Sequence, residues 1–363
     1  MSERPTSLTV AELQDLLSSI GIAQDLDCSG QDLGSLRVTS GMMLRSHFAD
    51  ADFSGSALKN VIITKGDLTR TRWDRTAPRT TAFVQCDFTG ADFTGADLET
   101  CAFTGCTFAG ARFDGVRLFR CAFSDCDMTG SVFAGADLAE CALMGGTLGT
   151  ADFAGARMVG VTLHKPDFAL LGTTGTRFER CAFLEAKAAG LNLSGMAFPQ
   201  CNFTAAALDG TVMEGCDLNQ TVFMNATLRG ARLDRSLIAR SLFTGADLTG
   251  ATLRAANLMQ SNFQKSVLTW TDFSGSYLEQ AQFAGAVCRG TVFNDANLAT
   301  ADFAGADLTG ARVMNAGLYR TSLHNTIETD SVWTGSNRAI ALGTDPQRKA
   351  AEDFTPAARR PSP

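Results

Sequence analysis

The sequence repeats with a strict period of five residues over most of its length, and this period constrains the fold more than any other feature. Blocks such as ADFTG-ADLET-CAFTG-CTFAG (91–110) show it directly. The large apolar residue of each block, here called its centre, recurs at every fifth position from Cys28 to Trp333, which gives 62 blocks without an insertion or deletion. An internal repeat of this kind has to be interpreted before any local preference. The centres that are not Phe, Leu, Met, Ile, Val or Trp are Cys28, Pro78, Thr173, Ala188, Cys288 and Glu328.

The residue two positions before each centre is small. From Gly41 to Ser331 it is Ala, Ser, Thr, Cys, Val or Gly, except at Pro166, Leu171, Leu191 and Met196. Neither the helical period of 3.6 nor the strand period of 2 fits a strict period of five. The pattern instead predicts a chain that turns a corner at every block and points one large and one small side chain inward.

Four such corners close a coil of 20 residues, and stacked coils pair their backbones at about 4.8 Å. We therefore predict a rod of about 15 coils and roughly 74 Å, in which each coil buries its core against its neighbours. Reading every twentieth residue supports this prediction, because it gives an almost unbroken aromatic column: Phe83, Phe103, Phe123, Leu143, Leu163, Phe183, Phe203, Phe223, Phe243, Phe263, Phe283 and Phe303.

The A(D/N)(L/F)xx blocks resemble those of the pentapeptide-repeat family over 28–333, more than four fifths of the chain. The resemblance implies an all-β solenoid, the right-handed quadrilateral parallel β-helix. It implies little about function, because the family includes topoisomerase-binding antibiotic-resistance proteins, secreted effectors and many members of unknown role.

An open β-helix exposes its core at both ends and needs caps. Residues 9–12 (TVAE) predict a capping box that opens a helix in the N-terminal segment 1–27, with Gly21 at its end. We interpret this helix as a lid over the first coil, with a partner-binding helix as the alternative. Its apolar side is Leu13, Leu16, Leu17 and Ile20. The repeat region is expected over 28–335, followed by a loose tail, 336–363, with at most a short helix near 347–354.

The repeat accounts for the residues that otherwise suggest chemistry. Of the 11 cysteines, two are centres and the rest occupy the small inward position, where cysteine is a well-behaved buried residue. His47, His164 and His324 fall singly at outward positions, with no partner at ligand spacing. Gly at the end of a block is expected to supply the positive φ of a corner. We therefore predict no catalytic, cofactor-binding or metal-binding residues, and no enzyme.

The composition limits the classes of partner and the cellular locations that the protein can have. A net charge of −7 and a pI near 5.1 argue against direct nucleic-acid binding, which requires a basic surface. No apolar run reaches the roughly 18 residues of a membrane span, and no basic-then-apolar leader opens the sequence. We expect a cytoplasmic protein without a membrane span. Export without a cleaved signal peptide stays open.

One side of the predicted helix, centred on Phe103 and Phe123, has apolar residues where outward side chains are expected. Exposed apolar patches of such extent usually mark an interface. The alternative is that alanines and scattered methionines are ordinary wall. The residues predicted to contact a protein partner are Met42, Leu44, Ile62, Val84, Met144, Leu184, Val222, Met224 and Leu242.

The resulting hypothesis is a non-enzymatic scaffold that binds another protein, of unknown identity, along one long face; self-association stays open. One alternative is a nucleic-acid mimic that binds a DNA topoisomerase, for which Asp87, Asp92, Asp97 and Glu99 form the densest acidic patch. The other is a secreted effector or secretion-system adaptor. A local irregularity over 164–196, beside Lys165 and Lys187, is either a tolerated bend or a site.

Overall fold

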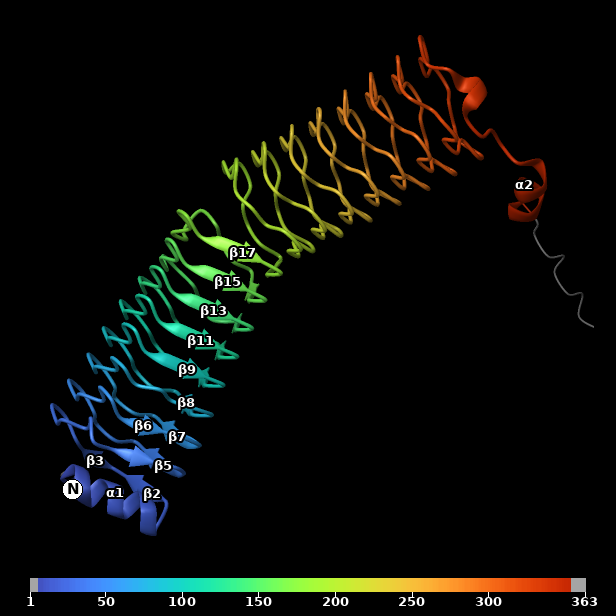
Figure 1. Cartoon of the computed structure of the whole chain (residues 1–363). Coiled ribbons are helices and arrows are strands. Elements are labelled where there is room, and N and C mark those ends of the chain that lie inside the picture. Colours follow the sequence, from blue (N-terminus) through green and yellow to red (C-terminus); the bar gives the residue numbers. More distant parts are fainter. Residues whose placement is uncertain (1–5, 354–363) are drawn as a thin grey trace, which may run out of the picture. The chain divides into compact units, whose positions relative to one another are not determined.

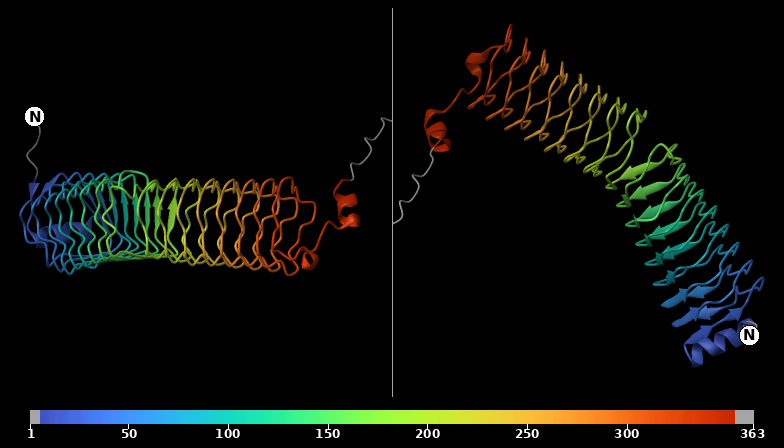
Figure 2. Two further views of the ribbon diagram at one scale, coloured as in Figure 1. Left: turned by 90° about the horizontal axis from the view of Figure 1, so that it is seen from above. Right: turned by 180° about the vertical axis from the view of Figure 1, so that it is seen from behind.

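The computed structural model describes residues 6–353 (Figure 1). Its described residues fall into two compact units: the first holds 6–188 and 197–206, and the second holds 189–196 and 207–353. Both units are built from stacked coils of the chain (Figure 2). The domain limits 28 and 335 expected from the repeat remain a proposal.

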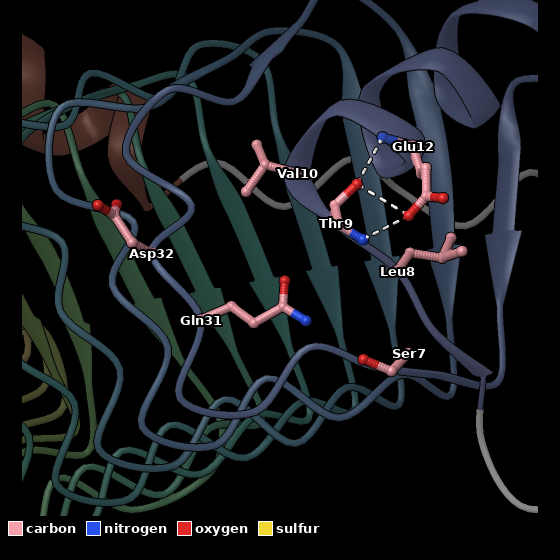
Figure 3. A pocket seen from close by; sticks show the side chains of 7 residues that line it. All are labelled: Ser7, Leu8, Thr9, Val10, Glu12, Gln31 and Asp32. Carbon is pink, nitrogen blue, oxygen red and sulfur yellow. Dashed lines mark hydrogen bonds between the residues drawn. The ribbon is translucent and has the colours of Figure 1, made fainter.

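The first unit begins with the predicted cap. Helix α1 (Val10–Ser19) opens at Thr9, whose side chain accepts a hydrogen bond from the Glu12 N–H at 3.3 Å, while the Glu12 carboxylate accepts from the Thr9 N–H at 2.8 Å (Figure 3). This confirms the capping box. Leu13 and Leu17 are buried, but Ile20 is 68% exposed, so its predicted place on the buried side is wrong. Ile20 is the C-cap, where the chain leaves the helix.

Parallel strands form the walls of the first unit. Nine of them make one sheet, in which each strand pairs with the strand 20 residues further along, as Phe103 pairs with Phe123. These strands are β2 (Ile22–Gln24), β5 (Gly41–Leu44), β7 (Val61–Thr64), β8 (Ala82–Val84), β10 (Ala102–Thr104), β12 (Ala122–Ser124), β14 (Ala142–Met144), β16 (Thr162–His164) and β18 (Ala182–Leu184).

A second wall of the first unit is a five-stranded sheet with the same 20-residue register. Its strands are β9 (Asp97–Glu99), β11 (Arg117–Phe119), β13 (Asp137–Ala139), β15 (Arg157–Val159) and β17 (Arg177–Glu179). Two short pairs complete the strands of this unit: β1 (Thr6–Ser7) with β3 (Leu26–Asp27), and β4 (Arg37–Val38) with β6 (Ala57–Leu58). The remaining sides contribute isolated parallel bridges, such as Asp87 to Thr107.

The predicted count of about 15 coils is too high for the regularly stranded solenoid, whose nine-stranded sheet makes about eight turns. In the second unit the 20-residue spacing continues as isolated bridges instead of strands, for example Thr227 to Asp247 and Val267 to Val287. The physical reason is that most blocks there form a turn immediately after the centre, which leaves one residue of each side in extended pairing.

The core of each unit is the predicted column of centres. In the first unit the ring centroids of Phe83 and Phe103 lie 4.9 Å apart and those of Phe103 and Phe123 lie 4.7 Å apart, with nearly parallel planes. In the second unit the rings of Phe243 and Phe263 lie 4.8 Å apart. The spacing equals the distance between paired strands, so backbone pairing and ring stacking reinforce one another.

The outward Asp that precedes many centres stabilises the following turn, as expected. The Asp87 carboxylate accepts the Thr89 N–H at 2.9 Å, and Asp92 accepts the Thr94 N–H at 2.9 Å. Positive φ at the end of a block is more general than predicted. Gly90 has φ +67°, but Arg70 at the same place in another block has φ +53°. The corner therefore favours Gly without requiring it.

The second unit ends in a folded segment. A 3₁₀ turn, η1 (Arg338–Ile340), is followed by helix α2 (Pro346–Glu352), so the predicted short helix is present as far as 352. Residues 354–363 of the predicted loose tail lie outside the described residues.

His324 is 3% exposed, so its predicted outward, isolated position is wrong. Its Nε2 lies 3.0 Å from the Glu352 carboxylate of α2, and its Nδ1 accepts the Asp345 N–H at 3.1 Å. The five-residue period places His324 on the outside of its coil, but the chain after the repeat returns to cover it.

The Phe column predicts a severe effect of a charge at its middle. We expect Phe123→Asp to destabilise the first unit by more than ~4 kcal/mol, because an unpaired carboxylate would replace a ring that is 2% exposed. Thermal and denaturant unfolding followed by circular dichroism measures this. The control is Ser124→Asp on the outer face of the same strand, which should change stability by less than about 0.5 kcal/mol. A cooperative Phe123→Asp protein with wild-type melting would contradict the stacked core.

The cysteines should not react with alkylating reagents in the native state. All 11 are buried free thiols, so an alkylating reagent cannot reach them in the native state. Burial also raises the pKa of Cys28 and Cys216 to about 11. A hydrogen bond with a neighbouring cysteine lowers the pKa of Cys86, Cys121 and Cys181, so burial alone protects these three thiols. We expect negligible labelling by iodoacetamide in native buffer and complete labelling in guanidinium chloride, counted by mass spectrometry. Fast native labelling of most thiols would mean that the inward register is wrong.

Candidate protein-binding surface

The outer face of the nine-stranded sheet in the first unit carries no Asp, Glu, Lys or Arg. In each strand the central residue points inward, and one residue on either side of it points outward. We call these outward residues the stripe. They are Ile22, Gln24, Met42, Leu44, Ile62, Thr64, Ala82, Val84, Ala102, Thr104, Ala122, Ser124, Ala142, Met144, Thr162, His164, Ala182 and Leu184.

Four of the predicted contact residues are neighbours in this sheet. Met42 pairs with Ile62, and Leu44 and Val84 flank Thr64 in the adjacent column. Ile62 is 39% exposed and the other three are half-buried. Sequence reasoning missed Ile22, which pairs with Met42 and is 46% exposed, because it lies before the first block. Together these residues form one contiguous apolar patch at the N-terminal end of the stripe.

The other two predicted residues of the first unit stand apart from that patch. Met144 is 38% exposed and Leu184 is half-buried, and His164 lies between them in the sheet order. Between Val84 and Met144 the stripe consists of Ala, Thr and Ser. The middle of the stripe therefore has short, uncharged side chains, and the larger side chains lie toward its two ends.

The five-stranded sheet of the same unit is charged instead. Seven of its ten outward residues are Asp, Glu or Arg: Asp97, Glu99, Arg117, Asp137, Arg157, Arg177 and Glu179. Many of them form ion pairs between coils. Arg117 and Arg79 each contact the Asp97 carboxylate, at 3.0 and 2.8 Å, and Arg157 contacts Asp137 at 3.1 Å. The two walls thus differ in charge although they share one backbone register.

Polar and charged side chains border the stripe at its corners. Arg45 pairs with Asp25 at 2.7 Å, and Lys165 pairs with Glu185 at 3.1 Å. The hydrogen bond from Lys165 holds the pKa of the Glu185 carboxyl below its usual range. An uncharged centre with a charged border is the usual anatomy of a protein interface.

In the second unit the three predicted residues lie where the 20-residue pairing continues as isolated bridges, and they are described separately. Val222 bridges to Leu242, which is 37% exposed, as is Met224. Larger exposed side chains that the prediction missed flank a different column of centres, the one that includes Leu258 and Leu278. They are Leu237, Met259, Tyr277 and Tyr319, all at outward positions that the five-residue period already identifies.

Comparison with known proteins supports this architecture. The model of the pentapeptide repeat region matches residues 96–168 and 236–313, and that of pentapeptide repeats (8 copies) matches 201–237. Together the matches cover 186 of the 363 residues. The chain belongs to the pentapeptide-repeat family.

Solved pentapeptide-repeat structures are similar to this family member at low sequence identity. HetL from the cyanobacterium Nostoc sp. strain PCC 7120 is 22% identical, with 69% of this chain and 91% of HetL covered and a TM-score of 0.21. Full-length QnrB1 is 18% identical, with 65% and 91% covered and a TM-score of 0.25. A thylakoid-lumen protein of Arabidopsis thaliana is 28% identical, with 32% and 68% covered and a TM-score of 0.14. No curated protein sequence matches the chain.

Structures of the pentapeptide-repeat family are right-handed quadrilateral β-helices, so the fold class predicted from the five-residue period is confirmed. Over residues 6–353 no three His, Cys, Asp or Glu side chains are grouped to hold a metal ion. Within the same range no helix has the length and apolar character to cross a membrane.

Proposed function

We propose that this pentapeptide-repeat chain is a non-enzymatic scaffold that binds another protein through the stripe. The observation that carries the proposal is the absence of Asp, Glu, Lys and Arg from all 18 outward positions of the nine-stranded sheet. A solvated sheet face normally alternates apolar inward residues with polar or charged outward ones. A face without charges loses little solvation free energy when a partner displaces its water.

The size of the face also fits a protein partner. Eight steps of about 4.8 Å between nine strands give a length of about 38 Å, and three residues give a width of about 10 Å. An uncharged area of that shape exceeds what a small ligand covers. Ile22, Met42 and Ile62 stack at one end, and a few long apolar side chains of this kind supply most of the binding energy in protein interfaces.

The ion pairs of the other wall weigh against the nucleic-acid mimic. A mimic of DNA requires free carboxylates, yet Asp97 and Glu99 of the predicted acidic patch both contact Arg79, and Asp97 also contacts Arg117. Asp87 and Asp92 accept N–H groups of their own turns. No feature of the part of the chain that the structure describes favours the secreted-effector interpretation.

The stripe is tested by placing charges on its contiguous patch. We expect the triple variant Leu44→Glu, Ile62→Glu and Val84→Glu to bind its partner with at least ~100-fold lower affinity, because each carboxylate would be desolvated in the interface. The melting temperature should stay near the wild-type value, because these side chains lie outside the core. The measurement is quantitative co-purification from cells of the source organism, with light scattering to detect self-association.

The control is Thr94→Glu, Ala134→Glu and Thr174→Glu, which places three charges directly after the centre, the position that Leu44 and Val84 occupy, on another side of the first unit. It should keep every partner and the native oligomeric state. If the stripe variant also keeps them all, the stripe is an ordinary wall and the proposal fails.

A further inference from the structure

The wall of the first unit has an opening between residues 145–150 of one coil and 164–170 of the next. In a regular coil the N–H of a centre donates to a carbonyl of the following coil, as Met128 does to Thr147 at 2.8 Å and Phe168 does to Lys187 at 2.9 Å. Within the described chain no such bond joins Leu148 to Asp167. We call this opening the window.

Three further bonds of the same ladder are absent around the window: Gly145 N–H to His164 O, Thr150 N–H to Ala169 O, and Asp167 N–H to Gly146 O. The equivalent bonds are present in regular coils: Asp125 N–H to Met144 O at 2.9 Å, Gly110 N–H to Thr129 O at 3.0 Å and Thr147 N–H to Cys126 O at 2.9 Å. Parallel bridges join Asp127 to Thr147 and Asp167 to Lys187, but none joins Thr147 to Asp167. The two coils are separated over one side and its corner.

Two glycines give residues 145–150 a backbone conformation that regular blocks do not have. A Cβ on Gly146 would lie 2.0 Å from the Cys126 carbonyl oxygen, and one on Gly149 would lie 2.5 Å from the Thr129 Oγ1. Both residues have positive φ, +61° and +48°. At both positions a side chain would clash with the preceding coil, so glycine permits a backbone turn here that interrupts the ladder to the next coil.

The window reaches the core. Leu148 is half-buried, whereas the centres above and below it, Phe168 and Met128, are 6% and 1% exposed. Gly146 is exposed, although its position in the block is an inward one. A cavity of about 300 Å³ results, and Leu170, itself 52% exposed, lies at its border. The cavity is lined by 145–149, His164, Lys165, Asp167 and Leu170.

The groups at the window identify the class of ligand. Its edges present N–H donors at Gly145, Leu148, Thr150 and Asp167. They also present carbonyl acceptors at Gly146, His164 and Ala169 that receive no backbone N–H. An anion supplies acceptors alone and would meet the Asp167 carboxylate, and Lys165 already contacts Glu185 at 3.1 Å. A peptide backbone supplies donors and acceptors together, in the spacing of a ladder.

We propose that the window binds an extended peptide segment of a partner protein, which adds to the edges of the two coils by β-pairing. An aliphatic side chain of that segment packs against Leu148 and Leu170. Backbone pairing gives the affinity, and the apolar cavity selects the side chain. The proposal does not rest on the function proposed for the stripe, since the ladder groups other than the His164 carbonyl belong to the next side and corner of the coil.

The probe is an acetylated and amidated heptapeptide, Lys-Thr-Thr-Xaa-Thr-Thr-Lys, with Xaa as Leu, Ala or Glu. Residue-resolved hydrogen exchange of the wild-type chain should show Leu148 and Thr150 amides exchanging far faster than the Met128 amide. At millimolar concentration the Leu peptide should slow them about tenfold, the Ala peptide less, and the Glu peptide not at all. An analogue with N-methylated backbone amides should have no effect.

Two variants act as controls. Replacing 146–150 by the regular block of 91–95 (Gly146→Ala, Thr147→Asp, Leu148→Phe, Gly149→Thr and Thr150→Gly) should close the ladder and abolish the peptide effect. Leu170→Ser should weaken the binding of the Leu peptide several-fold and leave the binding of the Ala peptide unchanged. The stripe variant Leu44→Glu, Ile62→Glu and Val84→Glu should respond like wild type, so the two proposals fail separately.

The proposal is overturned if no peptide of the panel protects the amides, or if the N-methylated analogue protects them equally. It is also overturned if inorganic phosphate protects them where the peptides do not, since that result would assign an anion site. The N-methyl comparison uses the wild-type chain, so it decides the question even if the closed-ladder variant does not fold.

Discussion

The hydrogen-bonded pairing of each coil with the coil 20 residues later determines everything else in both units. It places like positions directly above one another at about 4.8 Å. Inside, this distance suits stacked rings, and Phe113 and Phe133 lie 4.5 Å apart with parallel planes. Outside, the same distance puts each side chain next to its equivalent in the next coil. A column of like charges would therefore repel and destabilise the unit.

The first unit solves that problem in two ways. In the five-stranded sheet one outward column alternates in sign, from Asp97 to Arg117 to Asp137 to Arg157, and the neighbours form ion pairs. Alternation breaks only at Arg177, which follows Arg157. The nine-stranded sheet instead omits charge altogether. Since alternation is available to this backbone, the fold does not require an uncharged wall, and a binding role explains it better than stability does.

The five-residue period predicted the ladder, the inward columns, the burial of the cysteines and the outward position of the stripe, because all of these follow from register alone. It did not predict the features that arise where the chain departs from register. His324 is outward by count but buried, because residues beyond the repeat return over it. One edge of the window, 164–170, lies in the segment 164–196 whose irregularity the sequence shows. The other edge was hidden, since Gly146 satisfies the rule for a small inward residue. What distinguishes Gly146 is the close approach of Cys126, which a sequence does not display.

A closed ladder leaves a β-helix few ways to bind. Its core is filled, its backbone groups are paired along the walls, and its corners carry turns that satisfy themselves, as Asp87 does with Thr89. A partner can therefore use outer side chains or an interruption of the ladder. The first unit offers one of each: an uncharged sheet face, and a gap where backbone donors and acceptors stand without partners. As proposed, the first would bind by burial of apolar surface and would tolerate many partner shapes, whereas the second would require an extended chain. Two such different modes, within one rigid register, would let a single unit hold a folded surface and a flexible segment of the same protein together.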